Sequence, residues 1–180
     1  LRSGACGAIR RIENSTLVAR ASSLATLEAK PFYLTPGGGG LLMGWAVHNL
    51  DWVRCLAGAE VTEVSGAVTA GVAPVREGEL NARLAFANGV EARVRVAIDL
   101  PAEMGRADGL GELRVHDDVG SRVLWTQPAF DPRASTDPVR LEAFRDLLQA
   151  FVDSVVGGRP PPVSGEDGRA AVALFERLRG

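Results

Sequence analysis

The sequence predicts an α+β fold with an open, mostly antiparallel β-sheet of about six strands and helices packed on one face. Strand-like runs with alternating apolar residues fill the middle of the chain, and the pair Asn88-Gly89 is typical of a tight hairpin between two of them. Helical periodicity is confined to Leu41–Ala57 and the C-terminal part. Because the 180 residues are 46% hydrophobic, we expect one core and one domain over residues 1–180.

The chain is predicted to open with a strand and a loop. In Ile9–Arg20 β-branched residues recur with rough alternation after a glycine-containing turn, which favours a strand. Residues 21–40 contain two prolines and the four glycines Gly37–Gly40, so they are predicted to be irregular. The backbone of such a loop can approach a ligand closely, and we expect Gly39 and Gly40 to line a binding site.

A helix is predicted over Leu41–Ala57, where apolar residues recur at near-helical spacing, with Gly58 as its C-cap. Further strands are predicted over Val61–Val72, Leu80–Ala87, Val90–Leu100, Glu112–Val115 and Arg122–Thr126. In the third of these, Glu91, Arg93 and Arg95 alternate with apolar residues, so that one face packs and the other meets water or a partner.

Two helices are predicted to close the chain. The first has Asp137 as its N-cap and Pro138 at its first position, and it ends at a pair of glycines from Gly157. The second begins after Ser164, which precedes an acidic first turn, and runs to about Leu178.

Composition and charge exclude several functions. The 20 Lys and Arg residues are scattered and balanced by 22 Asp and Glu residues, which argues against a nucleic-acid partner. The longest apolar stretch, Leu41–Leu56, is too short and too polar to span a membrane, and no secretory signal opens the chain. We therefore expect a soluble, cytoplasmic protein. Cys6 and Cys55 stand far apart without nearby ligands, so free thiols and no metal site are expected.

The most informative segment for function is residues 37–58, which places His48 and Asp51 three residues apart on one helix face. Histidine exchanges a proton near neutral pH, and a nearby carboxylate can fix its tautomer, so His48 is a candidate acid/base or hydroxyl-binding residue. The alternative for His48 is a hydrogen-bonded structural role. The alternative for Asp51 is a surface ion pair with Arg54.

Two tryptophans of the same helix are candidates for contact with a substrate. Trp45 and Trp52 carry broad rings that can stack on a sugar. At near-helical spacing in an apolar helix, tryptophans more often belong to the core, which is the alternative for both.

Three segments, in this order, resemble one known family. They are LRSGACGAIR at the start, Gly37–Asp51 with its glycines and histidine, and FVDSVVGGRPPPVSGEDGRAAVALFE at Phe151–Glu176. They are similar to the turn into the first sheet strand, the histidine-bearing helix and the closing helix pair of the C-terminal, substrate-facing domain of Gfo/Idh/MocA oxidoreductases. This family comprises nicotinamide-dependent dehydrogenases of sugars and polyols.

The resemblance implies a function and a division of labour. His48 would be the catalytic histidine on the substrate side, with Trp45, Asp51, Gly39 and Gly40 around the substrate. NAD or NADP would be held by an N-terminal Rossmann domain that this chain lacks, because no GxGxxG motif follows a strand here. The open sheet face would join copies into a homo-oligomer.

Two departures from the family pattern stand out. Many members carry an Asp one helical turn before the histidine, where this chain has Gly44, so a carboxylate partner is missing. Glu28-Ala29-Lys30-Pro31 only loosely mimics the family's Glu-Lys-Pro motif and follows the first sheet strand, so Lys30 is predicted to be a solvated loop residue. The alternative function is therefore a non-catalytic small-molecule-binding or assembly module.

Overall fold

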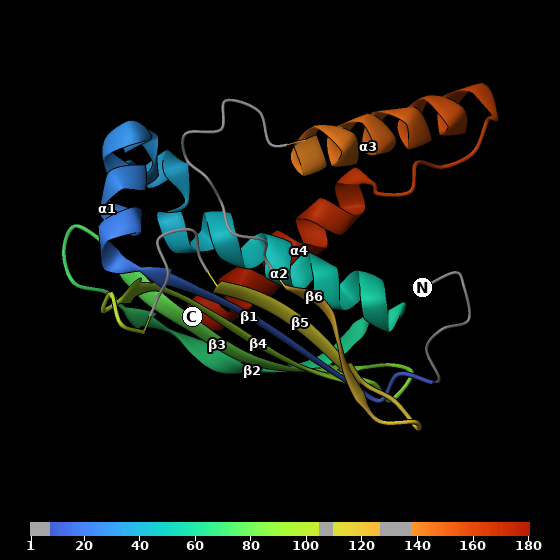
Figure 1. Cartoon of the computed structure of the whole chain (residues 1–180), viewed down its shortest axis with the longest axis horizontal. Coiled ribbons are helices and arrows are strands. Elements are labelled where there is room, and N and C mark those ends of the chain that lie inside the picture. The colour runs from blue at the N-terminus through green and yellow to red at the C-terminus, as the bar shows by residue number, and fades with distance from the viewer. Residues whose placement is uncertain (1–7, 105–109, 127–137) are drawn as a thin grey trace.

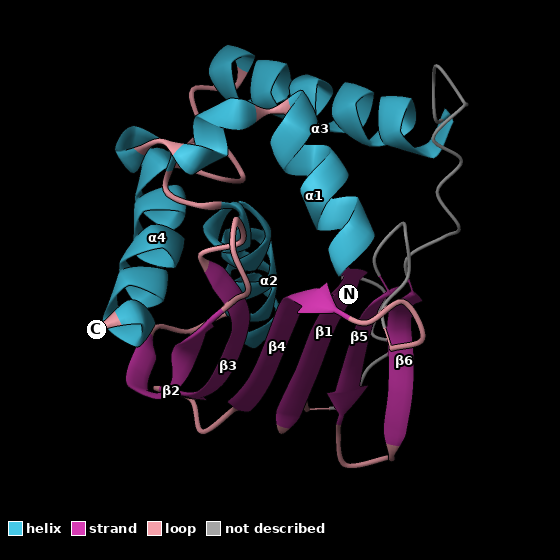
Figure 2. Ribbon diagram, turned by 90° about the vertical axis from the view of Figure 1, so that its left-hand side faces the viewer, coloured by secondary structure: helices cyan, strands magenta, loops and turns pink. Residues whose placement is uncertain are grey.

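The computed structural model describes residues 8–104, 110–126 and 138–180. Six strands form one open sheet in the order β2-β3-β4-β1-β5-β6, and the helices lie on one side of it (Figures 1 and 2). The strands are β1 Arg11–Ala19, β2 Val61–Ala70, β3 Glu77–Phe86, β4 Glu91–Leu100, β5 Leu110–His116 and β6 Ser121–Thr126. The predicted fold class is confirmed. Within the described ranges, no helix has the length and hydropathy needed to cross a membrane.

The sheet is mixed because its first strand lies in its middle. β1 pairs in parallel with β4 and antiparallel with β5, and the other pairings are antiparallel. The hairpin predicted at Asn88-Gly89 is present: Gly89 has a φ of 82°, and the Phe86 N–H donates to the Val90 carbonyl at 2.9 Å. The alternation predicted for β4 is also confirmed, with Glu91, Arg93 and Arg95 exposed.

The helices are α1 Arg20–Ala29, α2 Leu41–Ala57, α3 Pro138–Val156 and α4 Gly165–Arg179, with two short 3-10 turns, η1 Pro31–Leu34 and η2 Pro36–Gly38. The prediction that residues 21–40 are irregular is wrong for α1. The prolines and glycines that suggested a loop all lie beyond Ala29, whereas α1 itself is rich in the helix formers alanine and leucine. Ser23 of α1 is buried, and its hydroxyl donates to the Ile98 carbonyl of β4.

α2 forms the centre of the helical layer. Its bounds are those predicted, and Gly58 caps it in the left-handed conformation. Leu42, Ala46, Leu50 and Val53 of α2 are buried against the sheet. α4 packs beside α2 through another set of buried residues: Ala171, Leu174, Phe175 and Leu178. This arrangement leaves the opposite face of α2 open.

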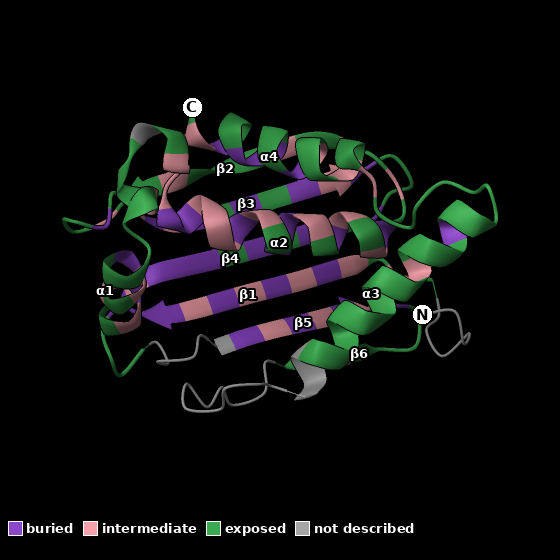
Figure 3. Cartoon of the chain, turned by 90° about the horizontal axis from the view of Figure 1, so that it is seen from above, coloured by how far each residue is buried: buried purple, intermediate pink, exposed green. Residues whose placement is uncertain are grey.

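α3 lies apart from the other helices and, in Figure 1, above α2 and α4. Its apolar residues form a continuous stripe, yet each is at least half exposed: Leu141, Phe144, Leu147, Leu148, Phe151, Val152 and Val155. Figure 3 shows this helix almost entirely in the colour of exposed residues. An amphipathic helix is normally stabilised by burying such a stripe, so α3 has a face without a partner in the described structure.

Candidate functional site

The outer face of α2 carries the residues on which the function was predicted. Gly44, His48, Trp52 and Cys55 follow one another at helical spacing, and the last three are exposed. Nothing in the described part of the chain forms a hydrogen bond or an ion pair with His48. The structural alternative for His48 required such a partner, so its imidazole is available to a ligand. Its catalytic role stays a prediction.

Asp51 forms an ion pair within α2 that does not involve His48. Its carboxylate lies 3.7 Å from the guanidinium of Arg54, which is the ion pair proposed as its alternative. The Arg54 side chain is only 9% exposed and also donates to the Asp167 carbonyl at 3.2 Å. Asp51 thus belongs to a network that joins α2 to the start of α4, and a substrate-binding role for it remains a prediction.

The two tryptophans of α2 are partly engaged in the core. Trp45 is half-buried and packs against the core cluster. Trp52 is 39% exposed and meets Trp125 of β6 edge to face, with ring centroids 5.0 Å apart. Trp45 therefore helps to hold α2 on the sheet, as the core alternative proposed, whereas Trp52 contacts β6 and stays exposed.

Gly39 and Gly40 lead into α2 with positive φ angles of 72° and 90°. Arg179, the last residue of α4, donates to the Gly39 carbonyl at 2.6 Å and forms a two-point ion pair with Glu77 of β3 at 2.6 and 3.1 Å. Glu77 raises the pKa of Arg179 above its ordinary value. His48 lies eight residues beyond Gly40, about 12 Å along the helix. The structure therefore fixes this turn firmly but places it away from His48.

Tyr33 is the residue that the sequence interpretation missed. It lies in η1, and a Cβ atom built on Gly44 would stand 3.0 Å from its hydroxyl oxygen. The missing side chain at Gly44 had been interpreted only as the loss of a carboxylate. A glycine inside an otherwise regular helix often marks a close approach, and this signal could have pointed to a neighbour over Gly44.

Lys30 and Cys55 were both predicted to take no part in a site. Lys30 is exposed at the end of α1, as expected for a solvated residue. Cys55 is a free, exposed thiol, whereas Cys6 lies outside the described residues. In the part of the chain that is described, no three His, Cys, Asp or Glu side chains gather closely enough to hold a metal ion.

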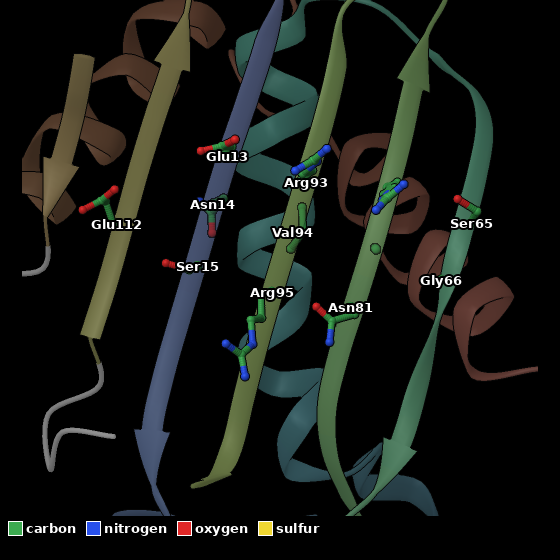
Figure 4. A pocket seen from close by; sticks show the side chains of 12 residues that line it. Glu13, Asn14, Ser15, Ser65, Gly66, Asn81, Arg93, Val94, Arg95 and Glu112 are labelled. Atoms are coloured by element: carbon green, nitrogen blue, oxygen red, sulfur yellow. The ribbon is translucent and has the colours of Figure 1, made fainter. Parts of the chain in front are cut away.

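The sheet face opposite the helices forms a broad, shallow concavity of about 760 Å³ (Figure 4). Its lining is polar and includes Glu13, Ser15, Asn81 and Arg93. Arg93 of β4 stands directly opposite Arg83 of β3, and neither has an ion-pair partner among the described residues. Like charges directly opposite each other destabilise a sheet. This open face therefore carries two adjacent positive charges, with Glu13 of β1 opposite Arg93 on its other side.

Known proteins place this geometry in a family. Residues 1–119 match the model of the GFO/IDH/MocA C-terminal domain. The chain belongs to the GFO/IDH/MocA family. Over 162 residues it is 30% identical to a myo-inositol 2-dehydrogenase of Thermotoga maritima, an alignment that covers 76% of this chain and 45% of that protein.

Solved structures of family members share the fold. A myo-inositol 2-dehydrogenase from Lactobacillus plantarum superposes with a TM-score of 0.71 at 20% identity, covering 98% of this chain and 55% of that one. A scyllo-inositol dehydrogenase from Lactobacillus casei, solved with NAD(H) and scyllo-inositol, gives a TM-score of 0.71 at 17% identity over 99% and 56% of the two chains. The chain thus spans about half the length of these GFO/IDH/MocA relatives.

The described part of this family member does not fit a dinucleotide. A dinucleotide needs a glycine-rich turn from a parallel strand into a helix, whose N-terminus binds the pyrophosphate. Here β1 passes directly from Ala19 into α1 at Arg20 without a glycine. We therefore assign no cofactor-binding residue to these elements.

Proposed function

We propose that this chain is a single domain, the substrate-facing half of an NAD- or NADP-dependent dehydrogenase that oxidises a polyol, a sugar or a similar hydroxy compound. The observation that carries the proposal is an exposed, unpartnered His48 on the outer face of α2 in a member of the GFO/IDH/MocA family. The cofactor would be held by a domain outside this chain, and the protein would draw on the cytoplasmic nicotinamide pool.

His48 supplies the chemistry that this half can contribute. Oxidation of an alcohol releases the hydroxyl proton, and a neutral imidazole titrates in the range needed to accept it. The other groups predicted around the substrate are Trp45, Asp51, Gly39 and Gly40. Of these, Trp45 and Asp51 each lie three residues from His48 along the helix. Because Asp51 is paired with Arg54, Trp45 is the stronger candidate for contact with the substrate.

The exposed stripe of α3 supports the presence of a second body in the complete protein. Seven apolar side chains of α3 are at least half exposed, and burial against another surface would stabilise them. The relatives are about twice as long as this chain, so they contain a further domain's length of sequence. We propose that the nucleotide-binding domain provides that cover.

The open sheet face is proposed as the contact between copies in a homo-oligomer. In a two-fold contact the same patch meets itself, so acidic residues of one copy can be set over the basic pair of the other. Arg83 and Arg93 support this arrangement, since neither forms an ion pair within the described residues, although Glu13 of β1 stands opposite Arg93.

A kinetic comparison tests the function. In the protein encoded by the complete reading frame, myo-inositol with NAD or NADP is expected to be oxidised, and His48→Ala should lower kcat by ~100-fold or more, as loss of a general base does. His116→Ala is the matched control, since His116 is the only other histidine and lies on the sheet face beside Glu13.

Each outcome has a clear meaning. Unchanged turnover in His48→Ala would remove the role given to that residue. Calorimetric titration of the complete protein that detects neither NAD nor NADP binding would favour the non-catalytic binding or assembly module instead. The replacement of a family carboxylate by Gly44 is the observation that keeps this second function in view.

A further inference from the structure

The neighbourhood of Gly44 contains a polar group that the proposed function does not yet use. The hydroxyl oxygen of Tyr33 lies 3.0 Å, and its Cε1 atom 3.1 Å, from the point where a Cβ of Gly44 would stand. These distances are shorter than ordinary van der Waals contact. The ring therefore lies directly on α2, and any side chain at position 44, an aspartate included, would displace it.

The turn that carries Tyr33 is well fixed. The Thr35 N–H and the Thr35 hydroxyl both donate to the Phe32 carbonyl, at 3.0 and 2.7 Å. The rings of Phe32 and Tyr33 lie against each other, tilted by 32°, with their centroids 4.1 Å apart. Pro31 begins η1 and restricts the backbone there. The phenol is thus presented to α2 by an ordered turn.

Gly44 and His48 are four residues apart, so they are neighbours on one helix face, with about 5–6 Å between their Cβ positions. The phenol over Gly44 and the imidazole of His48 consequently flank one small area on the outer face of α2. Neither the Tyr33 hydroxyl nor His48 has a hydrogen-bond partner among the described residues, and Tyr33 is only half-buried. Two adjacent polar groups without protein partners are free to bind a molecule with adjacent hydroxyl groups.

We propose that Tyr33 is a substrate-binding residue, whose hydroxyl donates a hydrogen bond to one hydroxyl of a polyol while the neighbouring hydroxyl meets His48. This inference rests on the proposed function and deepens it. A phenol keeps its proton at neutral pH and can both donate and accept a hydrogen bond. Because it is neutral, the site selects a vicinal diol through its hydroxyl groups and not through charge.

Variants at the two contacting positions separate binding from packing. Tyr33→Phe keeps the ring and its contact with α2 but removes the hydroxyl. Gly44→Ala inserts a Cβ at the 3.0 Å contact and pushes the phenol away. Thr62→Val is the matched control, because the Thr62 hydroxyl bonds only to the Ala85 carbonyl in the distant part of the sheet.

The closing experiment measures KM and kcat for myo-inositol in the protein from the complete reading frame. Loss of one hydrogen bond to the substrate should raise KM up to about tenfold in Tyr33→Phe with a smaller change in kcat. Gly44→Ala should act in the same direction, and Thr62→Val should have no effect. An unchanged KM in Tyr33→Phe, in a protein that His48→Ala inactivates, would overturn the inference and leave the proposed function intact.

A protein that does not turn over the polyol would contradict the proposed function, and a binding measurement then decides on Tyr33. Tyr33 is the only tyrosine of the 180-residue chain, so in that chain by itself ¹³C-labelled tyrosine gives NMR signals from that ring alone. Titration with myo-inositol should shift these signals in the unmodified protein and not in Gly44→Ala. Signals that stay in place would overturn the inference.

Discussion

At the scale of single residues, two adjacent side chains of α2 have opposite environments, one buried and one exposed. Asn49 is buried, accepts a hydrogen bond from the Thr16 hydroxyl of β1 at 2.9 Å and donates to the Trp45 carbonyl at 3.0 Å. This polar contact sets the rotation of α2 on the sheet. His48, one residue earlier, is thereby turned to solvent, so the exposure of the proposed catalytic group depends on a buried bond.

Thr16→Val is expected to lower the free energy of unfolding by about 1–3 kcal/mol, because it leaves the Asn49 oxygen buried without a donor. Thr16→Ser keeps the hydroxyl and should lose much less. Urea unfolding monitored by circular dichroism measures both variants. Equal losses would mean that the methyl group, and not the hydrogen bond, stabilises the contact.

Sequence reasoning found His48 but not Tyr33, for a physical reason. A polar residue within an apolar helix is conspicuous along the chain, and its four-residue spacing from Gly44 can be counted. Tyr33 lies in a 3-10 turn and Gly44 lies in a helix, eleven positions further along the chain. Their close approach depends on Gly44 having no side chain. Only the folded backbone brings these two residues together.

At the scale of elements, the ends of a helix were predictable where a capping residue marks them in the sequence. α2 ends at Gly58 and α4 begins at Ser164, and both caps are visible in the sequence. α1 was missed because the prolines and glycines beyond Ala29 led to the prediction of one loop over all of residues 21–40. α3 itself was predicted from its ends, but the exposure of its apolar stripe was not, because a sequence pattern does not show what covers an apolar face.

The cap of α4 makes a pH-dependent contribution to stability. Ser164 and Asp167 form a reciprocal capping box, and hydrogen bonds from Ser164, with Arg54 nearby, lower the pKa of Asp167. A carboxylate with a lowered pKa contributes stability that is present above its ordinary pKa of about 4 and is lost as the pH falls through the folded-state value. The last helix should therefore weaken in acid.

Asp167→Asn should flatten the decline in unfolding free energy between about pH 5 and pH 2, because the group that titrates is removed. Glu166→Gln is the control, since Glu166 is an exposed neighbour in the same first turn. Chemical denaturation at a series of pH values provides the measurement. A decline as steep as that of the unmodified chain would show that other carboxylates govern the acid response.

At the scale of the whole molecule, the two faces of the sheet have different tasks. The helical face contains the core and supports the proposed substrate site on α2, whereas the open face is polar and carries the Arg83 and Arg93 pair. The two surfaces are separated by the thickness of the sheet. Changes on the open face should therefore alter association without altering the site.

Reversing both charges, Arg83→Glu with Arg93→Glu, is expected to weaken the proposed oligomer by ~10-fold or more, because a basic pair that met acidic residues of the second copy becomes repulsive. Sedimentation velocity over a dilution series measures this change. Arg169→Glu, an exposed reversal on α4, should leave the assembly unaltered. Identical sedimentation of all three proteins would place the contact elsewhere.

The stripe on α3 also bears on how the protein must be produced. A stretch of leucine, phenylalanine and valine side chains standing in water binds readily to other partly folded chains, and such surfaces promote aggregation. In the sequence this helix follows all six strands of the sheet that it does not cover. In the proposed arrangement the nucleotide-binding domain would shelter the stripe, so this chain produced without that domain is expected to aggregate more readily than the complete protein.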